Sequence, residues 1–103
     1  MDIEVLHARG LFARMKGLIG TRAWPRGRAL LIRPCNAVHT CFMRYPIDLV
    51  FLDRRGCIVK IVLGVHPWRL SVAWRATAVV ELTQGEATRL GWHVGTSLQS
   101  IVR

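Results

Sequence analysis

The sequence predicts an α+β domain that is rich in β-structure: a curved antiparallel sheet or a small barrel with two short flanking helices. Runs of β-branched and aromatic residues recur between turn residues, and two stretches carry apolar residues at helical spacing. At 103 residues, 51% of them hydrophobic, the chain can bury one core without disulfides. We therefore expect one domain over residues 1–103.

The first third of the chain contains a predicted strand, a helix and a second strand. Residues 2–6 form the first short strand. Apolar residues recur at helical spacing over 11–19, and Gly20 can end that helix. A strand over 29–33 stops at Pro34, because proline has no backbone N–H to donate to a sheet.

The middle of the chain predicts the central hairpin. Two extended runs, 38–43 and 47–53, are joined at Pro46, which favours an extended conformation before it. A tight turn over 53–56 leads into the β-branched strand 57–65. Alternation along 47–53 places successive side chains on opposite faces, so both faces of this strand carry apolar residues.

The last third predicts a strand, a helix and a closing strand. Residues 76–82 form an extended run. Thr83 fits the N-cap of a helix whose third residue is Glu86, the capping-box arrangement, and Gly91 can end that helix. A short strand over 97–102 completes the predicted sheet.

The formal net charge of +9 points to an anionic partner. Apart from Lys16 and Lys60 the basic residues are arginines, which favour planar contacts with phosphate or carboxylate. Seven lie in the first third: Arg9, Arg14, Lys16, Arg22, Arg26, Arg28 and Arg33. On one face they would attract nucleic acid, acidic lipid or acidic protein; scattered, they would form a solvated surface. The partner thus stays open among an anionic ligand, a protein and a nucleic acid.

The predicted compartment is the cytoplasm. Apolar runs are far shorter than the ~20 residues that span a bilayer. The first residues include Asp2 and Glu4, where a signal peptide would be basic. Cys35, Cys41 and Cys57 form an odd set without CxxC spacing, so reduced thiols are expected.

Polar residues on the predicted strands form the first candidate site. His39, Thr40, Asp48 and Glu81 combine an imidazole with two carboxylates, which suit acid/base chemistry or a metal. This is the hypothesis of a small hydrolase or metal-dependent enzyme using His39, Asp48 and Glu81. The structural alternative has Asp48 accepting hydrogen bonds from backbone N–H groups and Glu81 pairing with an arginine or capping the backbone.

Cysteine and histidine spacing gives weaker support for a metal or a nucleophile. Cys35, His39 and Cys41, with His66 as a fourth ligand, fit none of the usual zinc spacings. A Cys35 and His39 pair lacks an identifiable third group to orient it. We therefore expect no metal, no cofactor and no catalytic residue.

Tryptophans beside arginines favour a binding surface. Trp24, Trp68 and Trp74 each lie within two residues of an arginine, an arrangement that can stack bases, anchor a protein or seal the core. The loop 66–70, stiffened by Pro67, is the best single candidate. We predict a non-enzymatic binding or accessory module, with these binding residues: His39, Thr40, Arg44, Asp48, Trp68 and Glu81.

Several motifs occur in the order found in a known family. They are Met-Lys-Gly-Leu at 15–18, Cys-Asn-Ala-Val-His-Thr at 35–40, the run at 42–53, a turn with Gly56, and the segment from Ala76 to Gly85. Their order and spacing resemble the prokaryotic family catalogued as domain of unknown function 192, over nearly all of the chain. The resemblance implies a compact β-rich fold with flanking helices and no established biochemical activity.

The resemblance also marks candidate positions. The residues that match the family motif are Asp48, Asp53, Glu81 and Gly85. Many relatives look exported or lipid-anchored, with a leading apolar segment that is missing here, and Thr-Cys-Phe at 40–42 replaces the usual aromatic pair. Localisation is therefore not carried over from the family.

Overall fold

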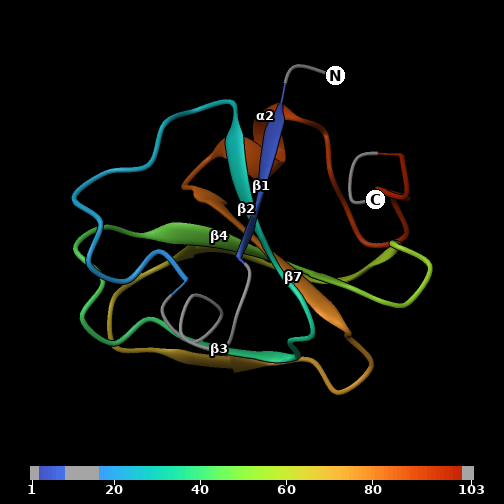
Figure 1. Ribbon diagram of the computed structural model, residues 1–103, viewed down its shortest axis with the longest axis horizontal. Helices are drawn as coiled ribbons and strands as arrows, with labels where there is room; N and C mark the ends of the chain where they lie inside the picture. The colour runs from blue at the N-terminus through green and yellow to red at the C-terminus, as the bar shows by residue number, and fades with distance from the viewer. Residues whose placement is uncertain (1–2, 9–16, 101–103) are drawn as a thin grey trace.

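The protein is described by a computed structural model that covers residues 3–8 and 17–100 (Figure 1). These residues form mostly β-structure, as predicted, with one short helix. In chain order the elements are β1 (Glu4–Ala8), β2 (Arg28–Ile32), β3 (Ala37–His39), β4 (Ile47–Leu52), β5 (Ile58–Val65), β6 (Leu70–Val72), β7 (Ala78–Thr83) and α2 (Glu86–Arg89). Among these residues no helix has the length and apolar character needed to cross a bilayer.

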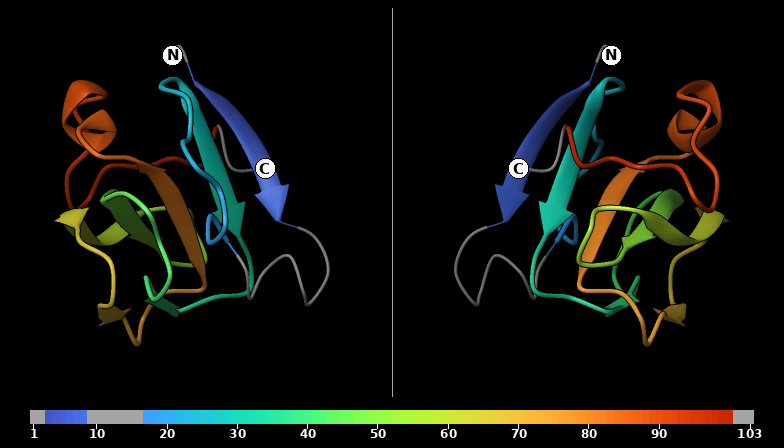
Figure 2. Two further views of the ribbon diagram at one scale, coloured as in Figure 1. Left: turned by 90° about the vertical axis from the view of Figure 1, so that its left-hand side faces the viewer. Right: turned by 90° about the vertical axis from the view of Figure 1, so that its right-hand side faces the viewer.

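Five strands form one open sheet in the order β1-β2-β7-β4-β5. The β1–β2 pair is parallel, and the other neighbours are antiparallel. A second sheet consists of β3 and β6 alone and lies at the opposite end of the molecule from α2 (Figure 2). Because β1 and β5 are separate edges, the sheet is open and the small-barrel alternative is wrong.

The interior strand β4 is buried along its whole length because both faces of the sheet are covered. Val50 and Leu52 belong to one core cluster, which also contains Trp92. Leu49 and Phe51 belong to the other. The alternation predicted for this strand is therefore confirmed.

The predicted β4–β5 hairpin is also confirmed, and its turn is held by one carboxylate. The Asp53 side-chain Oδ1 accepts the backbone N–H groups of Arg55 at 2.8 Å and Cys57 at 3.0 Å. The N–H of Gly56 donates to the Asp53 carbonyl, and Gly56 has a φ of 79°, which glycine adopts without strain. Asp53 thus has a structural role in this turn.

The helix predicted after Thr83 forms later and is shorter. Helix α2 has only four residues, and its N-cap is Gly85, with a φ of 94°. Thr83 remains paired with Ile47 in the sheet, and its hydroxyl donates to the Trp24 carbonyl. Sheet pairing therefore overrides the capping-box pattern. Glu86 is instead buried, and hydrogen bonds from Arg89 lower its pKa to about 2.

Three other predicted elements differ from the structure. The helix over 11–19 falls largely outside the described residues, and 17–20 form a turn, so two flanking helices are not supported. The run 38–43 leaves the sheet after His39. Instead of a strand over 97–102, the described part of that segment has a single bridge, between Ser97 and Cys57.

Candidate functional site

The six residues predicted to bind a ligand fall into two groups. One lies where the small sheet meets the 40–46 turn: His39, Thr40, Arg44 and Trp68. The other two, Asp48 and Glu81, are buried in the large sheet. Asp48 pairs with Leu82, and Glu81 pairs with Leu49. Since paired residues share a face and successive residues alternate, the two carboxyl groups lie on opposite faces.

This separation removes the shared acid/base site. A hydrolase or metal-dependent enzyme using His39, Asp48 and Glu81 together needs the three side chains in one place. His39 is exposed at the end of β3, while the two carboxyl groups are separated by the sheet. Within residues 3–8 and 17–100, no three His, Cys, Asp or Glu side chains gather to hold a metal.

Asp48 is fully buried and is held by three backbone N–H groups. Its Oδ1 accepts the N–H of Gly64 at 2.9 Å. Its Oδ2 accepts the N–H of Gly85 at 3.0 Å and that of Ala87 at 3.1 Å. These hydrogen bonds tie β5 to the start of α2, and they use both carboxylate oxygens. Backbone donors, and not an arginine, therefore compensate the buried charge.

Among the described residues, Glu81 accepts one hydrogen bond where Asp48 accepts three. Its Oε1 accepts the N–H of Leu18 at 3.0 Å, and 3% of the residue is exposed. Burial raises the pKa of Glu81 to about 7, although the hydrogen bond from Leu18 opposes the rise. A Cβ at Gly17 would come 2.7 Å from this Oε1, and Gly17 has a φ of +52°. The turn over 17–20 therefore packs directly on the carboxyl group.

Burial also raises the pKa of Tyr45, whose hydroxyl lies 2.6 Å from the Thr21 hydroxyl. Thr21 lowers this pKa, and the nearby Glu81 charge raises it by a smaller effect. The Thr21 hydroxyl also contacts the Leu18 carbonyl at 2.6 Å. The residues after Gly17 are thus fixed over Glu81 by several polar contacts.

Phe42 and Trp68 form the most unusual feature of the small-sheet end. Both have positive φ, at 69° and 67°, a conformation that is costly for aromatic residues. Their rings meet edge to face with centroids 4.6 Å apart. Even so, Phe42 is 67% exposed and Trp68 is 59% exposed. The backbone therefore presents two contacting aromatic rings to solvent.

Thr40 is buried beneath this pair and joins the two turns that carry it. Its hydroxyl donates to the His66 carbonyl at 2.7 Å and accepts the N–H of Arg69 at 2.8 Å. Its carbonyl accepts the N–H groups of Met43 and Trp68. Thr40 thus supports the two turns through its hydroxyl and its carbonyl.

We call the exposed surface around this pair the aromatic rim, defined by Phe42, Trp68, Leu70, Arg44 and Arg69. Leu70 is 72% exposed, and both arginines are exposed. Sequence reasoning missed Phe42, and it included Leu70 only as part of the candidate loop 66–70. Phe42 belongs to the Thr-Cys-Phe segment that replaces the aromatic pair usual in the resembling family. This departure is the one signal that could have identified it.

The basic residues of the first third do not form one patch within the described part of the chain. Arg26 pairs with Glu86, and Arg28 pairs with Glu4. Arg28 and Arg33 lie at opposite ends of β2. Arg9, Arg14 and Lys16 lie outside the described residues. Cys41 and Cys57 form no disulfide within the described residues.

Comparison with known proteins gives a family and a fold. The model of the DUF192 family, described as "Uncharacterized ACR", matches residues 1–100. A UPF0127 protein from Pyrococcus furiosus is 32% identical, over 94% of this chain and 86% of that protein.

Two solved structures are similar in fold. A protein of unknown function from Novosphingobium aromaticivorans has a TM-score of 0.81 and 21% identity, over 90% of this chain and 71% of that one. A proposed transcription regulator from Sinorhizobium meliloti has a TM-score of 0.83 and 22% identity, over 92% and 79%. The family match spans nearly the whole chain, so this protein belongs to the DUF192 family of uncharacterised proteins.

Proposed function

We propose that the protein is a non-enzymatic binding module that docks an acidic, partly apolar segment of a partner protein on the aromatic rim. The observation that carries this proposal is the pair of exposed aromatic rings on left-handed backbone at Phe42 and Trp68. Such strained residues persist only where the surrounding structure holds them, and they concentrate at functional sites. Here the hydrogen bonds of Thr40 fix the two turns that carry Phe42 and Trp68.

The composition of the rim supports a protein partner. Trp and Arg are enriched among residues that dominate binding energy at protein interfaces. Leu70 adds an exposed aliphatic side chain, which suits an apolar side chain of a partner better than the face of a base. The edge-to-face contact also leaves the two rings non-parallel, with 60° between their planes. Two bases stacked in succession would need ring faces in more similar orientations.

The charge of the rim supports an acidic partner. Arg44 and Arg69 are its charged members, and both are exposed. Neither arginine belongs to an ion pair within the described residues. The carboxylates Asp48 and Glu81 are buried elsewhere, so they do not offset this charge at the surface.

Peptide selection tests this proposal. A random peptide library is selected on the wild-type protein and counter-selected on the double variant F42N/W68N, in which asparagine keeps the left-handed backbone while removing the rings. We expect the enriched peptides to combine Asp or Glu with Leu or aromatic residues. Their affinity, measured by titration calorimetry, should fall by at least about tenfold in the variant.

The matched control is L63N/V94N, which removes two exposed apolar side chains outside the rim. Its peptide affinity should stay within about twofold of wild type, since Leu63 and Val94 are not rim residues. Equal losses in both variants would show that general surface hydrophobicity drives binding. Enrichment of peptides without acidic residues would contradict the proposed charge complementarity. Binding of single-stranded DNA with the same variant sensitivity would favour the nucleic-acid alternative.

A further inference from the structure

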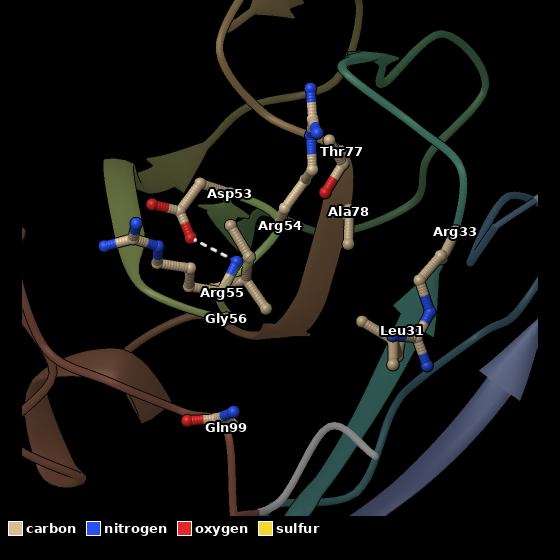
Figure 3. A pocket seen from close by; sticks show the side chains of 10 residues that line it. Leu31, Arg33, Asp53, Arg54, Arg55, Gly56, Thr77, Ala78 and Gln99 are labelled. Carbon is tan, nitrogen blue, oxygen red and sulfur yellow. Dashed lines mark hydrogen bonds between the residues drawn. The ribbon is translucent and has the colours of Figure 1, made fainter.

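We propose that the other end of the large sheet holds a second site, which binds a small phosphorylated molecule. The site is a hollow of about 370 Å³ beside the β4–β5 turn, the end of β2 and the start of β7 (Figure 3). Hollows of this size hold small ligands. The aromatic rim adjoins the beginning of β4, whereas this hollow adjoins its end, so the two surfaces are separate.

Arginines from separate segments surround the hollow. Arg33 follows β2, while Arg54 and Arg55 belong to the β4–β5 turn, and Figure 3 shows Arg33 and Arg55 on opposite sides of the space. An adjoining hollow of about 530 Å³ shares the two turn arginines and adds Arg75. Guanidinium groups bind phosphate oxygens through paired N–H donors, so this arrangement fits a phosphate better than a neutral ligand.

The opposing charge at this site is small and already engaged. Asp53 is the one carboxylate that lines either of these two hollows. Its Oδ1 accepts two backbone N–H groups of the turn. Arg54, Arg55 and Arg75 take part in none of the ion pairs formed within the described residues. By contrast, Arg26 and Arg28 each pair with a glutamate. Arg54 and Arg55 beside this hollow, and Arg75 beside the adjoining one, are therefore available to an anion.

The floor of the hollow is closed by core side chains. Leu31, Leu52 and Ala78 line it, and they are only 1%, 1% and 4% exposed. Thr77 and Gln99 add a hydroxyl and an amide at its wall. A small phosphorylated molecule would place its phosphate on the arginines and its other polar groups on this hydroxyl and amide.

Binding of adenosine diphosphate tests the inference, with pyrophosphate and adenosine as partial ligands. Amide shifts in NMR spectra of the wild-type protein should locate ADP at Gly56, Thr77 and Gln99 and leave Phe42 and Trp68 unchanged. Titration calorimetry should give tighter binding for ADP than for either partial ligand. The variants R54S and R55S should each weaken ADP binding by at least about fivefold, since each removes a charge-assisted contact.

The matched control is R22S, which removes the same charge from an exposed arginine in the 21–27 loop. Its ADP affinity should stay within about twofold of wild type. The inference is overturned if ADP does not bind, if its amide shifts lie elsewhere, or if R22S weakens binding as much as R54S. It is also overturned if single-stranded DNA binds at these amides and ADP does not. The NMR result needs no variant, so it decides the matter even if a substitution unfolds the chain.

Discussion

The interior of the large sheet and the aromatic rim both contain side chains that do not match their surroundings, and the mismatch is opposite in the two regions. Inside, Asp48 is a charged group in an apolar place, and three backbone N–H groups satisfy it. At the rim, Phe42 and Trp68 are apolar groups in a solvated place, held there on costly backbone. The interior arrangement stabilises the fold. The rim arrangement exposes apolar surface on strained backbone, so it is the one that needs a functional explanation.

Within the interior, the two carboxyl groups differ as well. Asp48 uses both oxygens as acceptors, whereas Glu81 accepts a single N–H from the described residues, that of Leu18, and burial raises its pKa to about 7. A buried carboxyl group with few donors is more stable when it is protonated. The comparison therefore predicts that the three hydrogen bonds of Asp48 support the fold, while ionisation of Glu81 opposes it.

The largest expected effect comes from Asp48→Ala. This change leaves the N–H groups of Gly64, Gly85 and Ala87 without their acceptor, so we expect the free energy of unfolding to fall by about 3 to 5 kcal/mol. Asp48→Asn keeps one oxygen and should cost less. Urea denaturation measures both. A loss below about 1 kcal/mol in the alanine variant would mean that water or a rearranged backbone replaces the carboxylate.

The next effect concerns pH and Glu81. Its folded pKa of about 7 lies above the ordinary value of 4.5, so its contribution to stability is fully present below about pH 4.5 and is lost as the pH rises to about 7. Glu81→Gln keeps an oxygen for the Leu18 N–H and cannot ionise. Relative to wild type, this variant should gain about 2 kcal/mol in unfolding free energy between these pH values. Parallel stability curves for the two proteins would contradict the raised pKa.

A smaller effect on stability should distinguish alanine substitution at Gly17 from the same substitution at Gly91, which has a similar backbone conformation. Gly17→Ala would place a Cβ 2.7 Å from the Glu81 Oε1, whereas at Gly91, with a φ of +72°, a Cβ meets nothing within 4 Å. Both variants bear the cost of alanine in the left-handed region, about 1 kcal/mol. Denaturation should show a loss about 1 kcal/mol greater at Gly17. Equal losses would mean that the turn over Glu81 moves aside freely.

Alternation and turn residues were enough to predict the core of the fold. The burial of β4 on both faces and the Gly56 turn follow from local sequence, and so does the β4–β5 hairpin. The helix start was mispredicted because pairing of Thr83 with Ile47 extends β7 through the expected cap. The parallel partner of β2 depends on a long-range crossover that local patterns do not specify.

The candidate site was predicted less completely. The sequence singled out Trp68 and Arg44 at the rim, and it raised the structural alternative for Asp48 that the backbone hydrogen bonds favour. The sequence could not identify Phe42, because the positive φ of this residue depends on the tertiary hydrogen bonds around Thr40. The separation of Asp48 from Glu81 depends on the β4–β7 register, which residue types alone left undetermined.

The most direct test of the account is a paired measurement on F42N/W68N, of its unfolding free energy and of its affinity for the selected acidic peptides. Because both rings are largely exposed, the free energy of unfolding should stay within about 0.5 kcal/mol of the wild-type value, while peptide affinity falls by at least about tenfold. A large loss of stability with unchanged peptide affinity would contradict the account, since the rings would then serve the fold and not a partner.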